Sequence, residues 1–301
     1  MPQLNKDKIK LGCAPIGWTN DDMPELGAEN TFQQTISEMA LAGFKGSEVG
    51  SHYPSDPDEL WKALQLRDLV ICNRWFSSFL ITKPYEEVEK EFIAELDFLY
   101  KVGSRVIGVS EQSYSTQGLD VAILDDSTRY KMNDEEWKLL TEGLDKLGQV
   151  AKDKGMKLTF HHHMGTVVQT PDEVERLLAE TTPGLTYLLF DTGHYSFTGE
   201  DPLAAIQKHI GRVGHIHLKD VRPAIVEKVK AEGLSFLQGV RLGQFTVPGD
   251  GAIDYDPIFE VIAAADYEGW FVVEAEQDPA IANPFEYALK ARKFIADHAG
   301  L

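Results

Sequence analysis

The stretch VEKEFIAELDFLYKVGSRVIGVSE, residues 88–111, contains one complete unit of the fold. Apolar residues recur every three or four positions through VEKEFIAELDFLYKVG, the spacing of an amphipathic helix. Gly103 closes that segment, where a left-handed helix cap favours glycine. RVIGVSE then follows as a short β-rich run. This stretch therefore predicts a helix, a tight turn and a strand.

The same alternation runs along the whole chain. Segments with helical spacing separate eight β-rich runs: KLGCAP near 10, FKGSEV near 46, LVICNRW near 71, RVIGVSE near 107, KLTFHHH near 160, TYLLFD near 188, GHIHLK near 216 and WFVVEAE near 272. Gly43, Gly155 and Gly211 punctuate helix ends as Gly103 does. Eight strand-helix units match a (β/α)8 TIM barrel, an α/β fold that typically needs roughly 250 residues.

Two features bear on the domain count. A doubly wound sheet would normally carry GxGxxG after its first strand, and GCAPIGW does not fit that motif. The stretch 221–252 is longer than a usual barrel connection, and both a lid and a plain surface excursion fit its length. With no repeat or linker in view, we expect one domain over residues 1–301.

Composition excludes several classes of function. The formal charge of −19 disfavours nucleic acid and anionic lipid as partners. No window reaches the roughly 18 apolar residues of a membrane helix, and the start lacks a secretory signal, so a cytoplasmic protein is expected. Cys13 and Cys72 are too few for a disulfide framework and are expected to be buried thiols. The sequence does not fix the number of subunits, and a homo-oligomer is compatible with it.

Successive side chains of a strand point to opposite faces, and this strand parity indicates which side chains meet at the carboxyl ends of the strands. TIM-barrel enzymes have their active sites at these ends. In KLTFHHH, Leu158 and Phe160 are expected to face the helices, which turns His161 and His163 into the barrel and leaves His162 with the helical shell. The next three runs bring Asp191, then His215, His217 and Lys219, then Glu274 and Glu276 to the same rim.

Carboxylates crowded with imidazoles in a partly buried site repel one another or shift their pKa values strongly unless a cation lies among them. Mixed nitrogen and oxygen ligands suit Mn²⁺, Co²⁺, Fe²⁺ or Zn²⁺, and the absence of nearby cysteine disfavours a thiolate site. A single histidine at a strand end is usually a hydrogen-bonded core residue. The joint pattern over four strands predicts a divalent metal site.

Several motifs, taken in order along the chain, resemble a known family: LGCAPIGWTNDDMPELG, GFKGSEVGSHYP, FHHHMGT, FDTGH, HIHLKDVRP and GWFVVEAEQDP. They are similar to the xylose-isomerase-like TIM barrel superfamily and, within it, to the inosose dehydratases of bacterial myo-inositol catabolism. The resemblance implies a hydro-lyase that removes water from scyllo-inosose (2-keto-myo-inositol), giving a trihydroxycyclohexane-1,2-dione. It also implies Mn²⁺ or Co²⁺, and glutathione, as cofactors, and a small cyclitol as the substrate.

The resemblance also implies metal ligands. In the superfamily, strands five to eight supply Glu, Asp, His and Glu, and the last three map onto Asp191, His217 and Glu274. The fifth-strand Glu has no counterpart, because His161 stands at its position. His161 is therefore expected to replace a carboxylate ligand, with His162 as a supporting partner, and a three-ligand site with His161 merely nearby stays open.

Dehydration of a 2-keto cyclitol needs a base and an acid beside the ring. The candidates are His163, His194 and Lys219. Lys219 is expected to contact a substrate oxygen, or to act as the base if desolvation beside the cation lowers its pKa; the alternative is that it pairs with Asp220 or another acid of the rim. Expected substrate contacts are Glu48, Asn73 and Trp75, at the ends of the second and third runs. Weaker candidates are Glu111, His52, Glu276, Trp18 and Asn20.

Two rival functions stay open at this stage. A ketose or cyclitol isomerase or epimerase would use the same metal-assisted chemistry but return the proton, and fold alone does not separate it from a dehydratase. A barrel that binds sugars without catalysis would need no metal.

Overall fold

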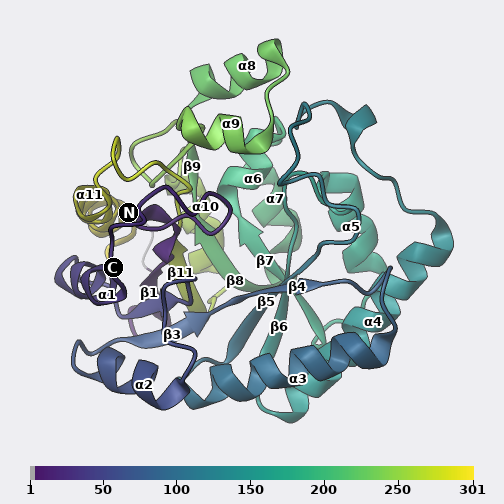
Figure 1. Ribbon diagram of the computed structural model, residues 1–301, viewed down its shortest axis with the longest axis horizontal. Helices are drawn as coiled ribbons and strands as arrows, with labels where there is room; N and C mark the ends of the chain where they lie inside the picture. Colours follow the sequence, from purple (N-terminus) through teal and green to yellow (C-terminus); the bar gives the residue numbers. More distant parts are fainter. Residues whose placement is uncertain (1–3) are drawn as a thin grey trace.

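The computed structural model describes residues 4–301 of the chain. Its parallel strands are β1 (Ile9–Cys13), β2 (Gly46–Glu48), β3 (Val70–Asn73), β4 (Trp75–Ser78), β5 (Val106–Glu111), β6 (Lys157–His161), β7 (Thr186–Asp191), β8 (Val213–Leu218) and β11 (Gly269–Val273). They pair in the order β3-β2-β1-β11-β8-β7-β6-β5-β4. Helices surround this sheet, as Figure 1 shows. The predicted TIM barrel is confirmed.

The third predicted strand is two short strands in the structure. β3 pairs with β2 and β4 pairs with β5, and only Arg74 separates them along the chain. The Arg74 carbonyl still accepts a hydrogen bond from the backbone N–H of Gly108 on β5, at 3.1 Å. β3 and β4 therefore share one barrel position and bring the two ends of the nine-stranded sheet together, which reconciles nine strands with eight repeating units.

Helices follow the strands as predicted. The helices of the ring are α1 (Phe32–Leu41), α2 (Pro57–Gln65), α3 (Tyr85–Lys101), α4 (Asp134–Asp153), α5 (Pro171–Glu180), α6 (Thr192–Phe197), α7 (Pro202–His209), α10 (Asp256–Ala264) and α11 (Pro284–Ala299). Short 3-10 turns lie at Pro15–Gly17, Asp126–Thr128 and Ile210–Arg212. No helix in the described part of the chain is long and apolar enough to cross a membrane.

The predicted strand parity is confirmed on the barrel strands. Leu158 and Phe160 belong to the large core between barrel and helices, while His161 of the same strand lines the central cavity. On β11, Phe271 stacks on Phe259 of α10, whereas Val272 packs inside the barrel against Cys72. Alternation therefore decides which side chains reach the functional end.

Three of the four predicted glycine caps adopt the left-handed backbone. Gly43, Gly103 and Gly155 have φ of 94°, 90° and 71°. The prediction for Gly211 is wrong, because this residue lies inside the 3-10 turn that joins α7 to β8 and has no positive φ. A helix that continues into a 3-10 turn needs no left-handed residue at that point.

The long connection after β8 folds into a small cap. It contains β9 (Asp220–Val221), α8 (Pro223–Glu232), α9 (Phe236–Arg241) and β10 (Phe245–Thr246), and β9 pairs antiparallel with β10. Phe236 and Phe245 are fully buried in a second apolar cluster, which also includes Met164 from the β6–α5 loop. In Figure 1, α8 and α9 lie at one edge of the helical ring. The segment is therefore packed onto the rest of the chain.

Candidate metal centre

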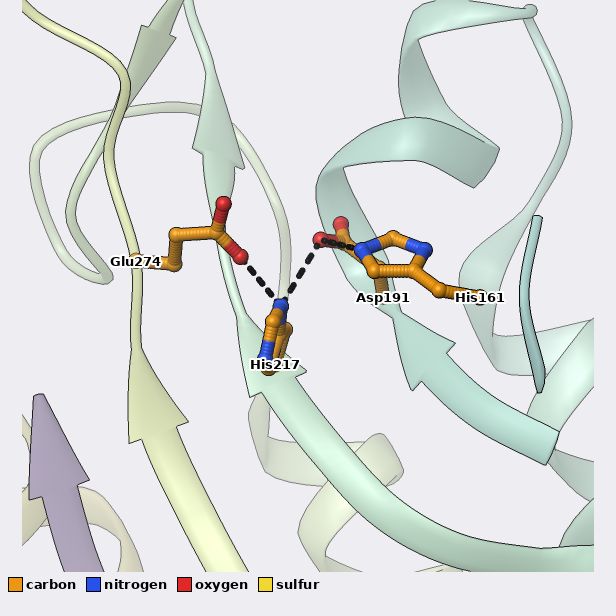
Figure 2. A group of neighbouring side chains, drawn as sticks. All are labelled: His161, Asp191, His217 and Glu274. Atoms are coloured by element: carbon orange, nitrogen blue, oxygen red, sulfur yellow. Dashed lines mark ion pairs between the residues drawn. The ribbon is translucent and has the colours of Figure 1, made fainter. Parts of the chain in front are cut away.

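Four side chains from four adjacent strands converge at the carboxyl end of the barrel. They are His161 from β6, Asp191 from β7, His217 from β8 and Glu274, the first residue after β11 (Figure 2). One nitrogen or oxygen atom from each lies within 4.8 Å of the corresponding atoms of the other three. All four residues are buried, so the structure places the predicted ligands together.

The facing atoms lack well-directed hydrogen bonds within the described chain. Asp191 Oδ2, His217 Nδ1 and Glu274 Oε2 are buried and make none. His217 Nδ1 nevertheless lies 3.5 Å from Asp191 Oδ2 and in close ion-pair contact with Glu274 Oε2, as Figure 2 shows. Buried polar atoms are normally satisfied. A cation satisfies several converging lone pairs at once, so this donor set fits a divalent ion with mixed nitrogen and oxygen ligands.

Backbone contacts orient two of these side chains. His161 Nδ1 lies 2.6 Å from the carbonyl oxygen of His162, and donating its proton there leaves the Nε2 lone pair facing Asp191 Oδ2 at 3.7 Å. Asp191 caps α6 by accepting a hydrogen bond from the backbone N–H of His194 on Oδ1, which leaves Oδ2 free. Metal-binding histidines commonly donate their second N–H in this way.

The electrostatics of the cluster favour a cation. Asp191, Glu274 and Glu276 are buried around one lysine, Lys219, and Glu48 is buried beside His217. Burial alone would raise the pKa of Asp191, but the charges of Lys219 and His194 hold it well below its ordinary value. The Glu274 and Glu48 carboxylates outweigh burial and raise the pKa of His217. The carboxylates of Asp191, Glu274 and Glu48 therefore stay ionised, and a bound cation would offset their mutual repulsion.

A cavity of about 950 Å³ opens beside the cluster, and three of its four side chains line it. His161, His217 and Glu274 line it, and so does Trp75, whose ring makes an edge contact with the His161 ring at a centroid distance of 5.6 Å. The volume lies at the upper end of the range for small-molecule sites, and the lining combines apolar and polar groups as such sites do. The candidate ligands therefore face a space large enough for a small polar substrate.

Comparison with known proteins agrees with this architecture. The xylose isomerase-like TIM barrel family matches residues 36–298. An inosose dehydratase of Clostridium beijerinckii is 61% identical over 298 residues, which cover 99% of both chains, and one of Geobacillus thermodenitrificans is 58% identical over 99% of this chain and all of the relative.

The chain belongs to the inosose dehydratase family. Among solved structures, the IOLI protein with a bound zinc atom superposes with a TM-score of 0.71 at 15% identity, covering 97% of this chain and 98% of that one. At this low identity the likeness supports the fold alone.

Lys219 is the charged centre of this dehydratase-family site. Its Nζ lies 3.0 Å from Glu276 Oε2, 3.2 Å from Glu274 Oε1 and 3.4 Å from Asp191 Oδ2. Desolvation alone would lower the pKa of Lys219, but these carboxylates raise it above its ordinary value. Without a cation, burial therefore does not lower the pKa of Lys219, and the side chain is a hydrogen-bond donor to these carboxylates. The alternative expectation, pairing with an acid of the rim, is confirmed for Glu276, Glu274 and Asp191. Asp220 is not the partner, because its Oδ1 accepts backbone N–H groups, including that of Val221.

The other two predicted catalytic residues differ in access to the cavity. His163 lines it, and its Nε2 lies 3.9 Å from Glu276 Oε1 while Nδ1 contacts the carbonyl oxygen of Met164. Burial lowers the pKa of His163 to about 3, so the ring is neutral near pH 7. His194 is fully buried outside the lining, and its Nε2 contacts Lys219 Nζ at 3.1 Å.

Glu276, only a weaker candidate from sequence, has a central position in the structure. It lines the cavity, contacts Lys219 and faces His163. Burial, countered in part by Lys219, raises the pKa of Glu276 to about 7. The available signal was strand parity, since Glu276 follows Glu274 by two residues.

The three predicted substrate contacts all line the cavity, but they differ in whether their polar or aromatic groups are free to meet a substrate. Trp75, at 37% exposure, offers its ring to the cavity. Glu48 and Asn73 also line the cavity but contact each other, with Asn73 Nδ2 donating to Glu48 Oε1 at 2.8 Å. Four weaker candidates do not line this cavity, namely Glu111, His52, Trp18 and Asn20.

The ring of His162 makes no hydrogen bond in residues 4–301, so its backbone carbonyl supports His161 and its imidazole does not. The ring packs against Tyr195, at a centroid distance of 4.3 Å, on the helical side of the strand. Its expected place in the shell is confirmed.

The cap closes one wall of the centre. Phe236 of α9 packs on the His163 ring with centroids 5.2 Å apart, and Phe245 of β10 packs on His194 at 5.4 Å. The Lys219 ammonium lies 4.8 Å from the Phe245 ring centroid. These aromatic rings exclude water from the charged groups, which strengthens the interactions between them.

Proposed function

We propose that this protein removes water from 2-keto-myo-inositol, giving a trihydroxycyclohexane-1,2-dione, with one divalent cation held by Asp191, His217, Glu274 and His161. Membership of the inosose dehydratase family supports the reaction. The observation that carries the metal assignment is the convergence of three unsatisfied buried atoms from three strands beside an open cavity. Mn²⁺ or Co²⁺ suits this set of imidazole and carboxylate ligands.

When bound, the cation supplies Lewis-acid stabilisation of the negative charge that develops on the substrate oxygens. The reaction breaks a C–H bond beside the ketone and then a C–O bond on the following carbon, and it releases one water molecule. The chain must therefore supply a group that accepts a proton from carbon and a group that donates one to the departing hydroxyl.

Glu276 is the proposed proton-transfer residue. Its Oε2 accepts a hydrogen bond from Lys219, which fixes the carboxylate at the cavity wall and leaves Oε1 on the side of His163. A pKa of about 7 lets the group take a proton from carbon and return it to the leaving hydroxyl. One carboxyl group therefore serves both steps if the hydrogen and the hydroxyl leave from the same face of the ring.

His163 and Trp75 are proposed to hold the substrate. The neutral His163 ring has a free Nε2 that accepts a hydrogen bond from a substrate hydroxyl, and Trp75 offers an apolar face to the ring carbons. His194 then supports Lys219 from behind. The cavity is also larger than a six-carbon ring requires, so its outer part leaves room for glutathione, which the family resemblance implies.

The test is an assay with metal-depleted protein and 2-keto-myo-inositol. Added Mn²⁺ or Co²⁺ should start a rise in the ultraviolet absorbance of the dione and a product lighter than the substrate by one water. A product of unchanged mass would indicate isomerisation or epimerisation and overturn the dehydration. Equal rates with and without metal, after depletion is confirmed by elemental analysis, would overturn the metal dependence. Parallel reactions with and without reduced glutathione test its contribution.

A further inference from the structure

Glu48 lies at the centre of a buried network on the side of His217 that faces away from the other candidate ligands. One of its oxygens, Oε1, receives three donors: Asn73 Nδ2 at 2.8 Å, His217 Nε2 at 2.9 Å and His215 Nε2 at 3.3 Å. The three partners come from β3 and β8, while Glu48 ends β2. The network therefore crosses the barrel interior from β2 to β8.

The two ring nitrogens of His217 face different partners. Nδ1 faces Asp191 and Glu274 in the candidate metal centre, whereas Nε2 faces Glu48. A neutral imidazole that offers a lone pair from one nitrogen carries its proton on the other. Because the Nε2–H that donates to the Glu48 carboxylate stays on the ring, a binding cation would displace the proton on Nδ1 and use the lone pair there. Such a contact also raises the basicity of the ligand nitrogen.

The surroundings hold Glu48 in this position. Its side chain is only 11% exposed, and Asn73 beside it is buried. Asn73 fits because residue 108 is glycine: a Cβ there would lie 3.0 Å from Asn73 Nδ2 and 3.2 Å from Asn73 Oδ1. The packing at Gly108 therefore favours the Asn73 position from which its amide reaches Glu48.

We propose that Glu48 is a positioning residue that orients His217 for metal binding through a carboxylate–imidazole hydrogen bond, with Asn73 holding the carboxylate in place. This assignment rests on the proposed function of the metal centre. It replaces the direct substrate contact expected for Glu48 and Asn73 from sequence. In this arrangement Glu48 acts on the reaction through the affinity and geometry of the cation.

Titration of the metal-depleted protein with Co²⁺ alone tests the proposal. Glu48→Gln keeps the size of the side chain but removes its charge, and we expect a Co²⁺ dissociation constant about 10- to 100-fold higher than for the wild type. The visible absorption of bound Co²⁺ should also change, because His217 is held less firmly. Glu276→Gln is the matched control, since it removes a buried carboxylate of the same cavity that makes no ion pair with His217.

Three results would overturn the proposal. Equal losses of Co²⁺ affinity in the two variants would mean that the total negative charge of the cavity, and not the hydrogen bond from His217 to Glu48, determines metal binding. An unchanged dissociation constant in Glu48→Gln together with a raised KM for substrate at saturating metal would return Glu48 to substrate binding. Failure of the wild type to bind Co²⁺ would overturn the proposed metal centre itself, and the inference with it.

A second variant covers the case in which Glu48→Gln does not fold, as judged by circular dichroism and thermal unfolding of the metal-free protein. Asn73→Ser removes the donor that fixes Glu48 but leaves the carboxylate in place. We expect a smaller loss of Co²⁺ affinity in the same direction, with KM near the wild-type value once metal is saturating. Unchanged Co²⁺ affinity would contradict the network.

Discussion

The two halves of the barrel mouth differ in the side chains that end their strands. In the half built from β6, β7, β8 and β11, buried imidazoles and carboxylates end the strands or immediately follow them, and their unsatisfied atoms face one another. In the half built from β1 to β5, the cavity is lined mainly by neutral groups such as Trp75, Ser77 and Gln112. We interpret the difference as a division of labour in which one half would hold the cation and move the proton, while the other, apart from Glu48 and Asn73 beside His217, would surround the substrate.

The largest effect is expected from a change in the half built from β6, β7, β8 and β11, which carries the candidate metal ligands. Asp191→Asn keeps the acceptor that caps α6 but removes a ligand charge, and we expect kcat/KM to fall by about 10³-fold, equivalent to roughly 4 kcal/mol. Elemental analysis should show little bound metal. The control is Glu111→Gln, a buried carboxylate on β5 that bonds to Ser78 and Leu80 outside the cavity and should keep near-wild-type kcat/KM. Similar losses in both variants would erase the distinction between the halves.

The second-largest effect is expected from removing the proposed proton-transfer residue, Glu276. Glu276→Gln should lower kcat by about 10²-fold, because it removes the proposed proton-transfer group while keeping its shape. A general base works when deprotonated, so wild-type kcat/KM should rise with pH up to an apparent pKa of about 7 or somewhat below, since a bound cation stabilises the ionised carboxylate. The variant should lack this acidic limb. An unchanged pH profile in Glu276→Gln would assign proton transfer to another group.

The smallest effect is expected from a change in the half built from β1 to β5, where neutral groups line most of the cavity. Trp75→Ala should raise KM by about fivefold with kcat nearly unchanged, because loss of an aromatic contact costs about 1 kcal/mol and affects ground state and transition state alike. Its Co²⁺ affinity should match that of the wild type. A loss of metal binding in Trp75→Ala would mean that the two halves are not separable.

The sequence predicted the features that depend on local periodicity. The alternation of side chains along single strands correctly predicted that His161, Asp191, His217 and Glu274 lie at one rim of the barrel. The repeated strand-helix units correctly predicted the barrel itself. The family resemblance, confirmed by the curated relatives, indicated the reaction class. The assignments of individual residues to metal, substrate or proton transfer stay predictions until the variants are measured.

The features that sequence did not predict arise from contacts between distant strands. Glu48 and His217 are 169 residues apart, so no spacing rule links them. The raised pKa of Lys219 depends on carboxylates from two other strands, whose combined charge outweighs desolvation. The break at Arg74 reflects the pairing of β3 and β4 with different neighbours. Packing of 221–252 over His163 and His194 is likewise a tertiary property.

The most direct test of the metal centre is an anomalous difference map from crystals of the protein grown with MnCl₂. We expect a single strong peak per chain at about 2.0–2.3 Å from Asp191 Oδ2, His217 Nδ1 and Glu274 Oε2, with His161 Nε2 as the fourth protein ligand. A map without a peak between these atoms, or with manganese bound only elsewhere, would contradict it.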